Sequence, residues 1–375
     1  MKINNFIKPI LVMAFINIGY STKSQVPLPC GNGRIDDSAL NVALRFEQLT
    51  NQPQFVSNLV RGYFHVFSND DGTQIAATST QISNEFTSLL ASYAADNTCF
   101  LFAGIDNYNS TALNQNFNAD NDPAGTALAP YQVPGCINIF YMRKINGNNN
   151  ACNPPCGYGG IALGGIPGTF FLVATGNIGP GNTIGHEMGH SLGLLHTFEK
   201  VYGYENINGS NSSTAGDKVT DTNADPFAYN GNACYSTNTS NCSYTGTCQD
   251  PNGATNFSPP YSNLMAYWWV GNSGGTCVVN PTATNGQFTR VNSFIATNSA
   301  LINCSSPSNL TLSGVNVSSG YYMNSAINTL NTSGTVNINL STIATLGGGL
   351  VQLEPGFHAT PNSSGFVHVI TKPCN

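Results

Sequence analysis

Residues 186–196 read His186-Glu187-Met188-Gly189-His190-Ser191-Leu192-Gly193-Leu194-Leu195-His196, and this stretch decides the fold expected around it. Its pattern, His-Glu-x-x-His-x-x-Gly-x-x-His, predicts a short helix with the first two histidines on one face, because positions four apart are neighbours on a helix. Glycine at the eighth position can take the left-handed conformation that ends a helix. The chain can then turn back and bring the third histidine to the same point.

Three imidazoles beside one carboxylate are the groups that a catalytic zinc site requires. We predict that His186, His190 and His196 bind Zn²⁺ and leave a fourth coordination position open for water. Glu187 is predicted to be the general base that takes a proton from this water. The alternative is a helix with three unrelated histidines. The chain has only 6 histidines in 375 residues, so chance is a poor explanation for three at this spacing.

Two later stretches extend the pattern. Residues 216–222 read Gly-Asp-Lys-Val-Thr-Asp-Thr, and residues 263–267 read Asn-Leu-Met-Ala-Tyr. Together with residues 186–196 they resemble the metzincin metalloproteases, and within these the pappalysin (cytophagalysin) family, over roughly residues 59–304. The sequence departs from that family at Asn223, where proline usually follows Asp-Thr.

This resemblance implies a zinc-dependent endopeptidase that hydrolyses protein or peptide substrates. It implies a Met-turn in which Met265 lies beneath the histidines. It also implies that the Tyr267 hydroxyl lies near the metal and stabilises the oxyanion, whereas the alternative is a buried aromatic residue with a satisfied hydroxyl. Calcium is implied as well, with Asp217, Asp221 and Thr222 as candidate ligands, because Ca²⁺ takes oxygen ligands from turns. Solvated turn carboxylates are the alternative.

The segments before residue 186 alternate between strand and helix patterns. Strands are predicted over residues 61–67, 99–103, 137–142 and 169–174, and a helix over 80–95. This order indicates an α/β fold with a mixed sheet above a cleft and an active-site helix that begins near Asn182 or Thr183. The resemblance implies that this fold is of metzincin type, with a twisted sheet. We expect loops over residues 106–134 and 146–160 and a last helix over 287–302. His65 is interpreted as a packed strand residue.

The two ends of the chain differ from this middle part. Residues 1–24 resemble a secretory signal peptide, with lysines before a short apolar run. Residues 25–57 are interpreted as a pro-segment, which predicts a zymogen. Within it, Cys30 is either a cysteine switch that binds the zinc or half of a disulfide. We assign residues 58–304 to the catalytic domain and residues 305–375 to a small all-β accessory domain, in which His358 and His368 are packing residues.

Composition narrows the classes of function. Charged residues make up 8% of the chain and the formal net charge is −6, without a basic patch, so we expect no nucleic-acid binding. No segment is long and apolar enough to span a membrane. The prediction is therefore a secreted, extracellular monomer. Its 11 cysteines favour disulfides, with a cluster at Cys234, Cys242, Cys248 and Cys277, and their odd number leaves at least one thiol without an intramolecular partner.

Two other functions stay open at this point. A binding or adhesion protein could have inherited the scaffold, with the C-terminal region as its working part, although the intact ligand set and Glu187 argue against it. A zinc hydrolase could also act on a substrate other than a peptide. A profile of digested proteins separates the two enzymes.

Overall fold

The computed structural model describes residues 58–370, apart from 97, 150–155, 180–181, 231–233, 235–236, 239–242, 268–280, 299–308, 326–328, 348–349 and 362–365. The expected signal peptide, the pro-segment and Cys30 lie outside these residues. In the part of the chain that is described, no helix has the length and apolar character needed to cross a membrane.

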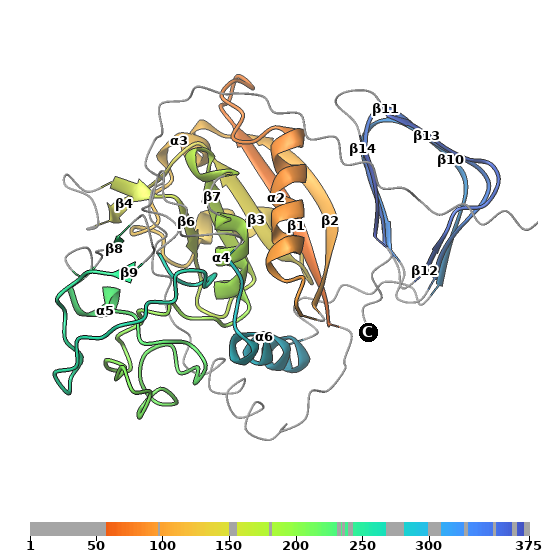
Figure 1. Ribbon diagram of the computed structural model, residues 1–375. Helices are drawn as coiled ribbons and strands as arrows, with labels where there is room; N and C mark the ends of the chain where they lie inside the picture. The colour runs from red at the N-terminus through yellow and green to blue at the C-terminus, as the bar shows by residue number, and fades with distance from the viewer. Residues whose placement is uncertain are drawn as a thin grey trace, which may run out of the picture.

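A five-stranded sheet forms the centre of the larger part of the chain (Figure 1). Its order is β2 (Thr98–Asn109), β1 (Asn58–Ser68), β3 (Ile137–Met142), β7 (Phe170–Ala174) and β6 (Gly160–Ala162). The first four strands are parallel, and β6 pairs with β7 in the antiparallel direction. The prediction of a mixed α/β sheet is therefore confirmed. Strands β3 and β7 are buried along their whole length, as parallel strands covered on both faces are.

Helices α2 (Ser79–Ser92) and α4 (Thr183–Ser191) pack together on one face of the sheet, and α6 (Asn285–Thr297) lies near one end of them (Figure 1). Helix α2 connects the parallel strands β1 and β2. It begins with a capping box, in which Thr78 Oγ1 accepts from the Gln81 amide and Gln81 Oε1 accepts from the Thr78 amide. Thr284 and Gln287 form the same arrangement at the start of α6.

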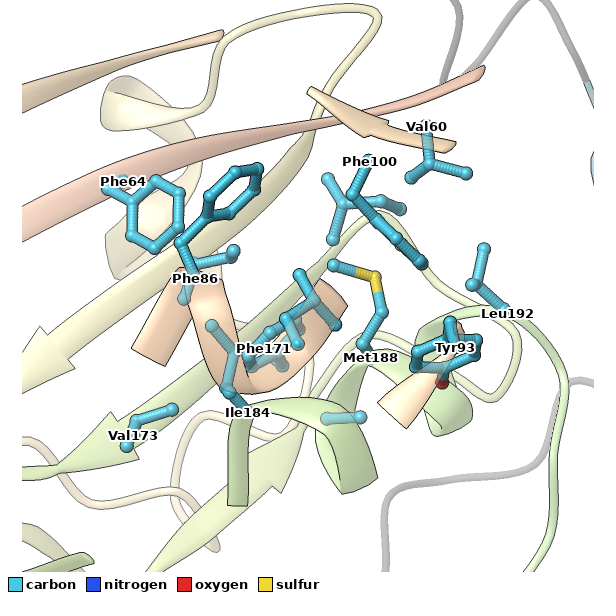
Figure 2. Packing of buried hydrophobic residues seen from close by; sticks show 14 of the residues in the cluster. Val60, Phe64, Phe86, Tyr93, Phe100, Phe171, Val173, Ile184, Met188 and Leu192 are labelled. Atoms are coloured by element: carbon cyan, nitrogen blue, oxygen red, sulfur yellow. The ribbon is translucent and has the colours of Figure 1, made fainter. Parts of the chain in front are cut away.

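Apolar side chains of these helices and of the sheet share one buried layer (Figure 2). The ring of Phe64 on β1 stacks on Phe102 of β2, with centroids 4.5 Å apart, and meets the edge of Phe86 on α2 at 6.2 Å. Met188 brings the helix that carries His186 and His190 into the same layer. Truncating a buried aromatic side chain such as Phe64 to alanine costs about 3–5 kcal/mol. Because Met188 belongs to this layer, helix α4 is part of the main hydrophobic core.

Two segments that we expected to be loops contain regular structure. Between residues 106 and 134, β2 continues to Asn109 and is followed by α3 (Thr111–Asn116) and a 3₁₀ helix (Thr126–Tyr131). Ser110 caps α3 by accepting from the Leu113 amide. Between residues 146 and 160, β4 (Ile145–Asn149) pairs with β5 (Cys156–Tyr158) before β6 begins. Both expectations were wrong because Asn- and Gly-rich composition also suits caps and edge hairpins.

Two predicted helices end earlier than the apolar pattern suggested. Helix α2 stops at Ser92, because Tyr93 takes a C-cap conformation and its hydroxyl donates to the Gly185 oxygen of α4. Helix α6 stops at Thr297, where the Asn298 side-chain amide donates to the Phe294 oxygen. In both cases the residue after the helix makes a side-chain hydrogen bond, and the helix does not continue past it.

The segment after α4 has little regular structure. It contains α5 (Phe227–Asn230) and two short antiparallel strands, β8 (Thr237–Asn238) and β9 (Ser243–Tyr244). A disulfide joins Cys234 to Cys248, two members of the predicted cysteine cluster. The other two, Cys242 and Cys277, lie outside the described residues.

The strands from Asn309 onward form a separate sheet with its own small core. Strand β10 (Asn309–Ser325) pairs in parallel with β11 (Thr329–Gly347), which pairs in parallel with β12 (Leu350–Gln352), β13 (Phe357–Pro361) and β14 (Phe366–Ile370). Figure 1 shows them following one path in successive layers. This stacking in parallel coils was not predicted from the sequence. That these residues are a separate accessory domain stays a prediction.

Candidate metal centre

Helix α4 carries the first two histidines and is buried over all nine of its residues. It begins at Thr183, as predicted, but Asn182 does not cap it with its side chain. Asn182 instead has a left-handed backbone, with φ 55° and ψ 41°, and its side-chain amide donates to the Ser92 hydroxyl of α2. The start of the helix is therefore tied to α2.

The helix ends as the glycine in the motif predicts. Gly193 has a φ of 90°, a value that favours glycine over residues with a side chain. The Leu194 amide donates to the Gly189 oxygen at 2.8 Å, and the Gly193 amide donates to the His190 oxygen at 3.0 Å. This is a Schellman ending, which reverses the chain within one turn. The reversal brings His196 back to the helix.

The three histidines converge on one point. His196 Nε2 lies 3.1 Å from His186 Nε2 and 3.0 Å from His190 Nε2. All three side chains are buried. Among the described His, Cys, Asp and Glu residues, they form the group whose ligand atoms lie close enough together to hold one metal ion. Three nitrogen atoms that meet in this way match the protein ligands of a catalytic zinc site.

Hydrogen bonds orient two of these rings for metal binding. His186 Nδ1 donates to the Leu264 oxygen at 2.7 Å, and His190 Nδ1 donates to the Leu194 oxygen at 2.8 Å. Because a carbonyl only accepts, both Nδ1 atoms carry the proton, and both Nε2 lone pairs are left for a metal. Burial lowers the pKa of His190 to about 4, and burial with the neighbouring histidines lowers the pKa of His186 and His196 well below the usual range. The rings are neutral at neutral pH, which is the form that binds metal.

Glu187 follows His186 in the chain and is fully buried. Its carboxylate lies against Gly160 of the edge strand β6, where an added Cβ would overlap Oε1 and lie 2.7 Å from Thr183 Cγ2. Gly160 was not predicted, because the glycine pair at 159–160 does not show which side chain will lie beside it. The absence of a side chain at this position leaves room for the carboxylate.

Met265, the residue of the expected Met-turn, packs against Gly189 of α4. It is buried, and an added Cβ at Gly189 would lie 2.5 Å from its sulfur. The surrounding turn is held by Asn263, whose Oδ1 accepts from the Met265 amide and whose Nδ2 donates to Gln287 Oε1 of α6, each at 2.8 Å. Gly189 and Met265 therefore fit each other directly below the two helical histidines.

The Tyr267 ring stands beside the histidines. Its centroid lies 5.0 Å from that of His196 and 5.9 Å from that of His186, and its side chain is 9% exposed. Phe198 and Phe227 pack on it at 4.5 and 5.5 Å. The ring is thus held in an aromatic cluster at the edge of the metal centre, where a phenol can donate a hydrogen bond to a negative oxygen.

The three candidate calcium ligands do not form one group. Asp217 and Thr222 are buried together, and Asp217 Oδ1 accepts from the Thr222 hydroxyl at 2.8 Å. The exposed carboxylate of Asp221 instead turns to the start of α6, where it accepts from the Thr284 hydroxyl at 2.6 Å and the Gly286 amide at 2.8 Å. A carboxylate at a helix N-terminus is well satisfied there. Asp221 therefore holds α6 to this loop.

A better partner for Asp217 is Glu205, which sequence reasoning missed. Glu205 is 5% exposed, and its Oε2 and Asp217 Oδ2 are both buried without a hydrogen-bond partner. Burial, followed by the carboxylates of Asp217 and Asp225, raises the pKa of Glu205 to about 8, and burial raises the pKa of Asp217 to about 7. Two buried carboxyl oxygens that lack a donor fit a bound cation or retained protons. No local motif marked Glu205.

Arg290 of α6 fixes the backbone of the same loop. Its side chain is 1% exposed, and its guanidinium donates to the oxygens of Asp217 and Lys218, each at 2.6 Å. A buried arginine is stable only when it is paired in this way. Through Arg290 and Asp221, α6 holds the loop after the metal helix at two points.

The comparisons with known proteins agree with this site. An extracellular metalloprotease of Podospora anserina is 28% identical to the chain over 183 residues, which are 46% of this chain and 58% of that protein. The match therefore spans little more than half of the relative. No protein-family profile matches the chain. The chain is thus similar to an extracellular metalloprotease and has three histidines placed to hold a metal.

Proposed function

We propose that the protein is a secreted zinc-dependent endopeptidase of the pappalysin branch of the metzincins. The observation that carries this proposal is the convergence of the Nε2 atoms of His186, His190 and His196, at 3.0–3.1 Å between neighbours, beside the buried Glu187. The similarity to an extracellular metalloprotease supports proteolysis and secretion. The resemblance at residues 216–222 and 263–267 supports the choice of branch.

In the proposed reaction each residue has one task. His186, His190 and His196 would hold a zinc ion, which would supply a bound water of lowered pKa and a Lewis acid for the scissile carbonyl. Glu187 takes the proton from the attacking water and passes it to the nitrogen of the leaving amine. The Tyr267 hydroxyl donates a hydrogen bond to the oxygen on which negative charge develops. Met265 supports the helix from below and keeps both helical histidines in place.

We further propose a calcium ion next to the metal helix, with ligands that differ from those first expected. Asp217 and Thr222 are kept, Glu205 is added, and Asp221 is left out because both its oxygens bind α6. The unpartnered oxygens of Glu205 and Asp217 support this set, because a hard cation takes such oxygens. The ion would remove the repulsion between the two carboxylates.

The organisation of the chain belongs to the same proposal. It comprises a signal peptide over residues 1–24, a pro-segment over 25–57, a catalytic domain over 58–304 and an accessory domain over 305–375. The zymogen state, the role of Cys30 and the monomeric state belong to it as well.

A cleavage-site profile of the purified protein tests the function. Peptides from a digested protein mixture, identified by mass, should show a consistent set of cut sites that disappears with a zinc chelator and returns with added Zn²⁺. Cleavage that a chelator leaves unchanged would contradict the zinc mechanism. Hydrolysis of esters or other small substrates without any cut peptide would favour a zinc hydrolase of another kind.

A further inference from the structure

A cavity of about 760 Å³ opens in the segment between α5 and the Met-turn. Its volume is within the range of sites that hold small ligands or side chains. All eleven residues that line it are uncharged. Three of them are aromatic, Tyr244, Phe257 and Tyr261, and six others carry hydroxyl or amide groups: Ser243, Thr247, Gln249, Thr255, Asn256 and Ser258.

Aromatic contacts link the wall of the cavity to the residues beside the histidines. Phe227, whose ring packs on Tyr267 at 5.5 Å, is two residues before Tyr229, whose ring packs at 5.5 Å on Phe257 in the cavity wall. On another wall, Tyr261 is four residues before Met265. Aromatic side chains therefore connect the cavity wall, through Phe257, Tyr229 and Phe227, with Tyr267 beside the histidines. An extended peptide advances about 3.3 Å per residue, so a substrate cut at the metal also contacts the protein several residues away from the scissile bond.

The walls of the cavity are built in advance. The disulfide between Cys234 and Cys248 closes the segment at one end. Asp250 accepts from the amides of Asn252 and Ala254 through Oδ1 and from that of Ile207 through Oδ2, at 2.8–2.9 Å. A wall that is already fixed loses little entropy when a ligand binds, so it can select between ligands.

We propose that this cavity is a substrate subsite, which accepts an uncharged side chain of the peptide at one fixed position away from the scissile bond. This inference rests on the proposed endopeptidase function. The aromatic rings can pack on the side chain, and the hydroxyl and amide groups can bond to a polar uncharged one. A charged side chain would lose its water without meeting an opposite charge, which is unfavourable. The substrate class is therefore peptides with an uncharged residue at that position.

A matched pair of asparagines tests the subsite. Asn256 lines the cavity, whereas Asn252 lies on the same loop outside it, and both are exposed, so lysine at either position leaves the fold intact. Asn256→Lys adds a positive charge to the cavity, so the variant should prefer an acidic residue at the substrate position that enters it. The ratio of kcat/KM for peptides with an acidic residue there to kcat/KM for peptides with a basic residue there should rise about tenfold, because opposite charges near a protein surface attract. Asn252→Lys should retain the wild-type profile. Thr247→Lys provides a second cavity variant.

A steric change gives an independent test. An added Cβ at Gly246 would overlap the Tyr244 hydroxyl, so Gly246→Ala moves the Tyr244 ring. Cleavage of peptides with a large uncharged residue at the same position should fall several-fold, while peptides with a small residue there are cut as before. In a Tyr244→Ala background, Gly246→Ala should have no further effect.

The outcomes separate the two proposals. A wild-type enzyme that cuts peptides, with cavity variants whose profiles stay unchanged or change equally at every position, would overturn the subsite and leave the endopeptidase in place. A wild-type protein that cuts no peptide would overturn both. The subsite is supported if the preference for acidic residues rises at one substrate position in both Asn256→Lys and Thr247→Lys and does not change in Asn252→Lys.

Discussion

His186 Nδ1 lies 2.7 Å from the main-chain oxygen of Leu264, a residue 78 positions further along the chain. This bond joins α4 to the turn beneath it and fixes the ring proton of His186 on Nδ1. The same turn supplies the Met265 sulfur under Gly189. The metal centre is therefore assembled from two distant segments, and its geometry depends on both.

The first prediction concerns the general base. Glu187→Gln keeps the shape of the side chain and removes its ability to take a proton, so kcat should fall by about 10²–10⁴-fold or more. Zinc content, measured by atomic emission, should stay at one ion per chain, because Glu187 is not a ligand. A variant that digests casein at the wild-type rate would contradict the role given to Glu187.

The second prediction concerns the room left for that carboxylate. Gly160→Ala places a methyl group against Glu187 Oε1 and should lower kcat at least tenfold by displacing the base from its position. Gly176→Ala is the matched control, because an added Cβ there meets nothing within 4 Å. Steady-state kinetics of both variants, with melting curves, provide the measurement. Equal activity in the two variants would show that β6 does not position Glu187.

The third prediction separates the two sets of calcium ligands. Calcium should raise the melting temperature of the wild-type protein, since an ion that binds only the folded state stabilises it. Glu205→Gln should weaken this effect. Asp221→Asn should retain the effect but lower stability by about 1 kcal/mol, because the start of α6 loses its anionic partner. Calcium dependence lost in Asp221→Asn and kept in Glu205→Gln would favour the ligands first expected.

The fourth prediction is a dependence of stability on pH. Glu85 of α2 is 1% exposed, and burial raises its pKa from 4.5 to about 7, although its Oε1 accepts from the Gly179 amide at 2.7 Å. Between these two pH values the folded chain keeps a proton that the unfolded chain has released. The free energy of unfolding should therefore fall as the pH rises from about 4.5 to about 7, by about 3 kcal/mol in all, and be level above.

Glu85→Gln removes this contribution. Urea unfolding between pH 4.5 and 8 gives the free energy of unfolding of the wild type and of the variant at each pH. The contributions of Glu205 and Asp217 are present in both proteins, so they cancel when the two values are subtracted. The stability of the variant relative to the wild type should rise across this range. A difference that is constant with pH would mean that the carboxyl group of Glu85 titrates alike in the folded and unfolded chains.

Most of the core could be predicted from the sequence, because local patterns specify it. The period-two and helical patterns located β1, β3, β7 and α2, and the motif placed His186, His190 and His196 at one point. The partners that come from elsewhere could not be found in this way. Gly160 and Glu205 matter through contacts made only in the folded chain, and neither has a local pattern that points to Glu187 or Asp217.

Contacts between distant residues also explain why the calcium ligands and the pairing of the C-terminal strands were not predicted correctly. Asp221 and Thr222 are adjacent in a motif, yet one binds the start of α6 and the other binds Asp217. Whether neighbouring carboxylates share one ion depends on side-chain direction, which spacing alone does not give. The parallel coils after Asn309 pair residues about twenty positions apart, such as Asn309 with Thr329, and an alternating pattern does not reveal which strands will pair.

The contacts of α6 with the segments around the histidines affect when the site can form during synthesis of the chain. The histidines of α4 are made first, but Leu264 and Met265 follow some eighty residues later and Arg290 about a hundred residues later. At about 5–20 residues per second, the ribosome needs roughly 5–20 s to supply these partners after His186. During this interval the nascent chain carries its ligands without the turn and helix that orient them. The chemistry of the site thus begins only after the structure that supports it has been made.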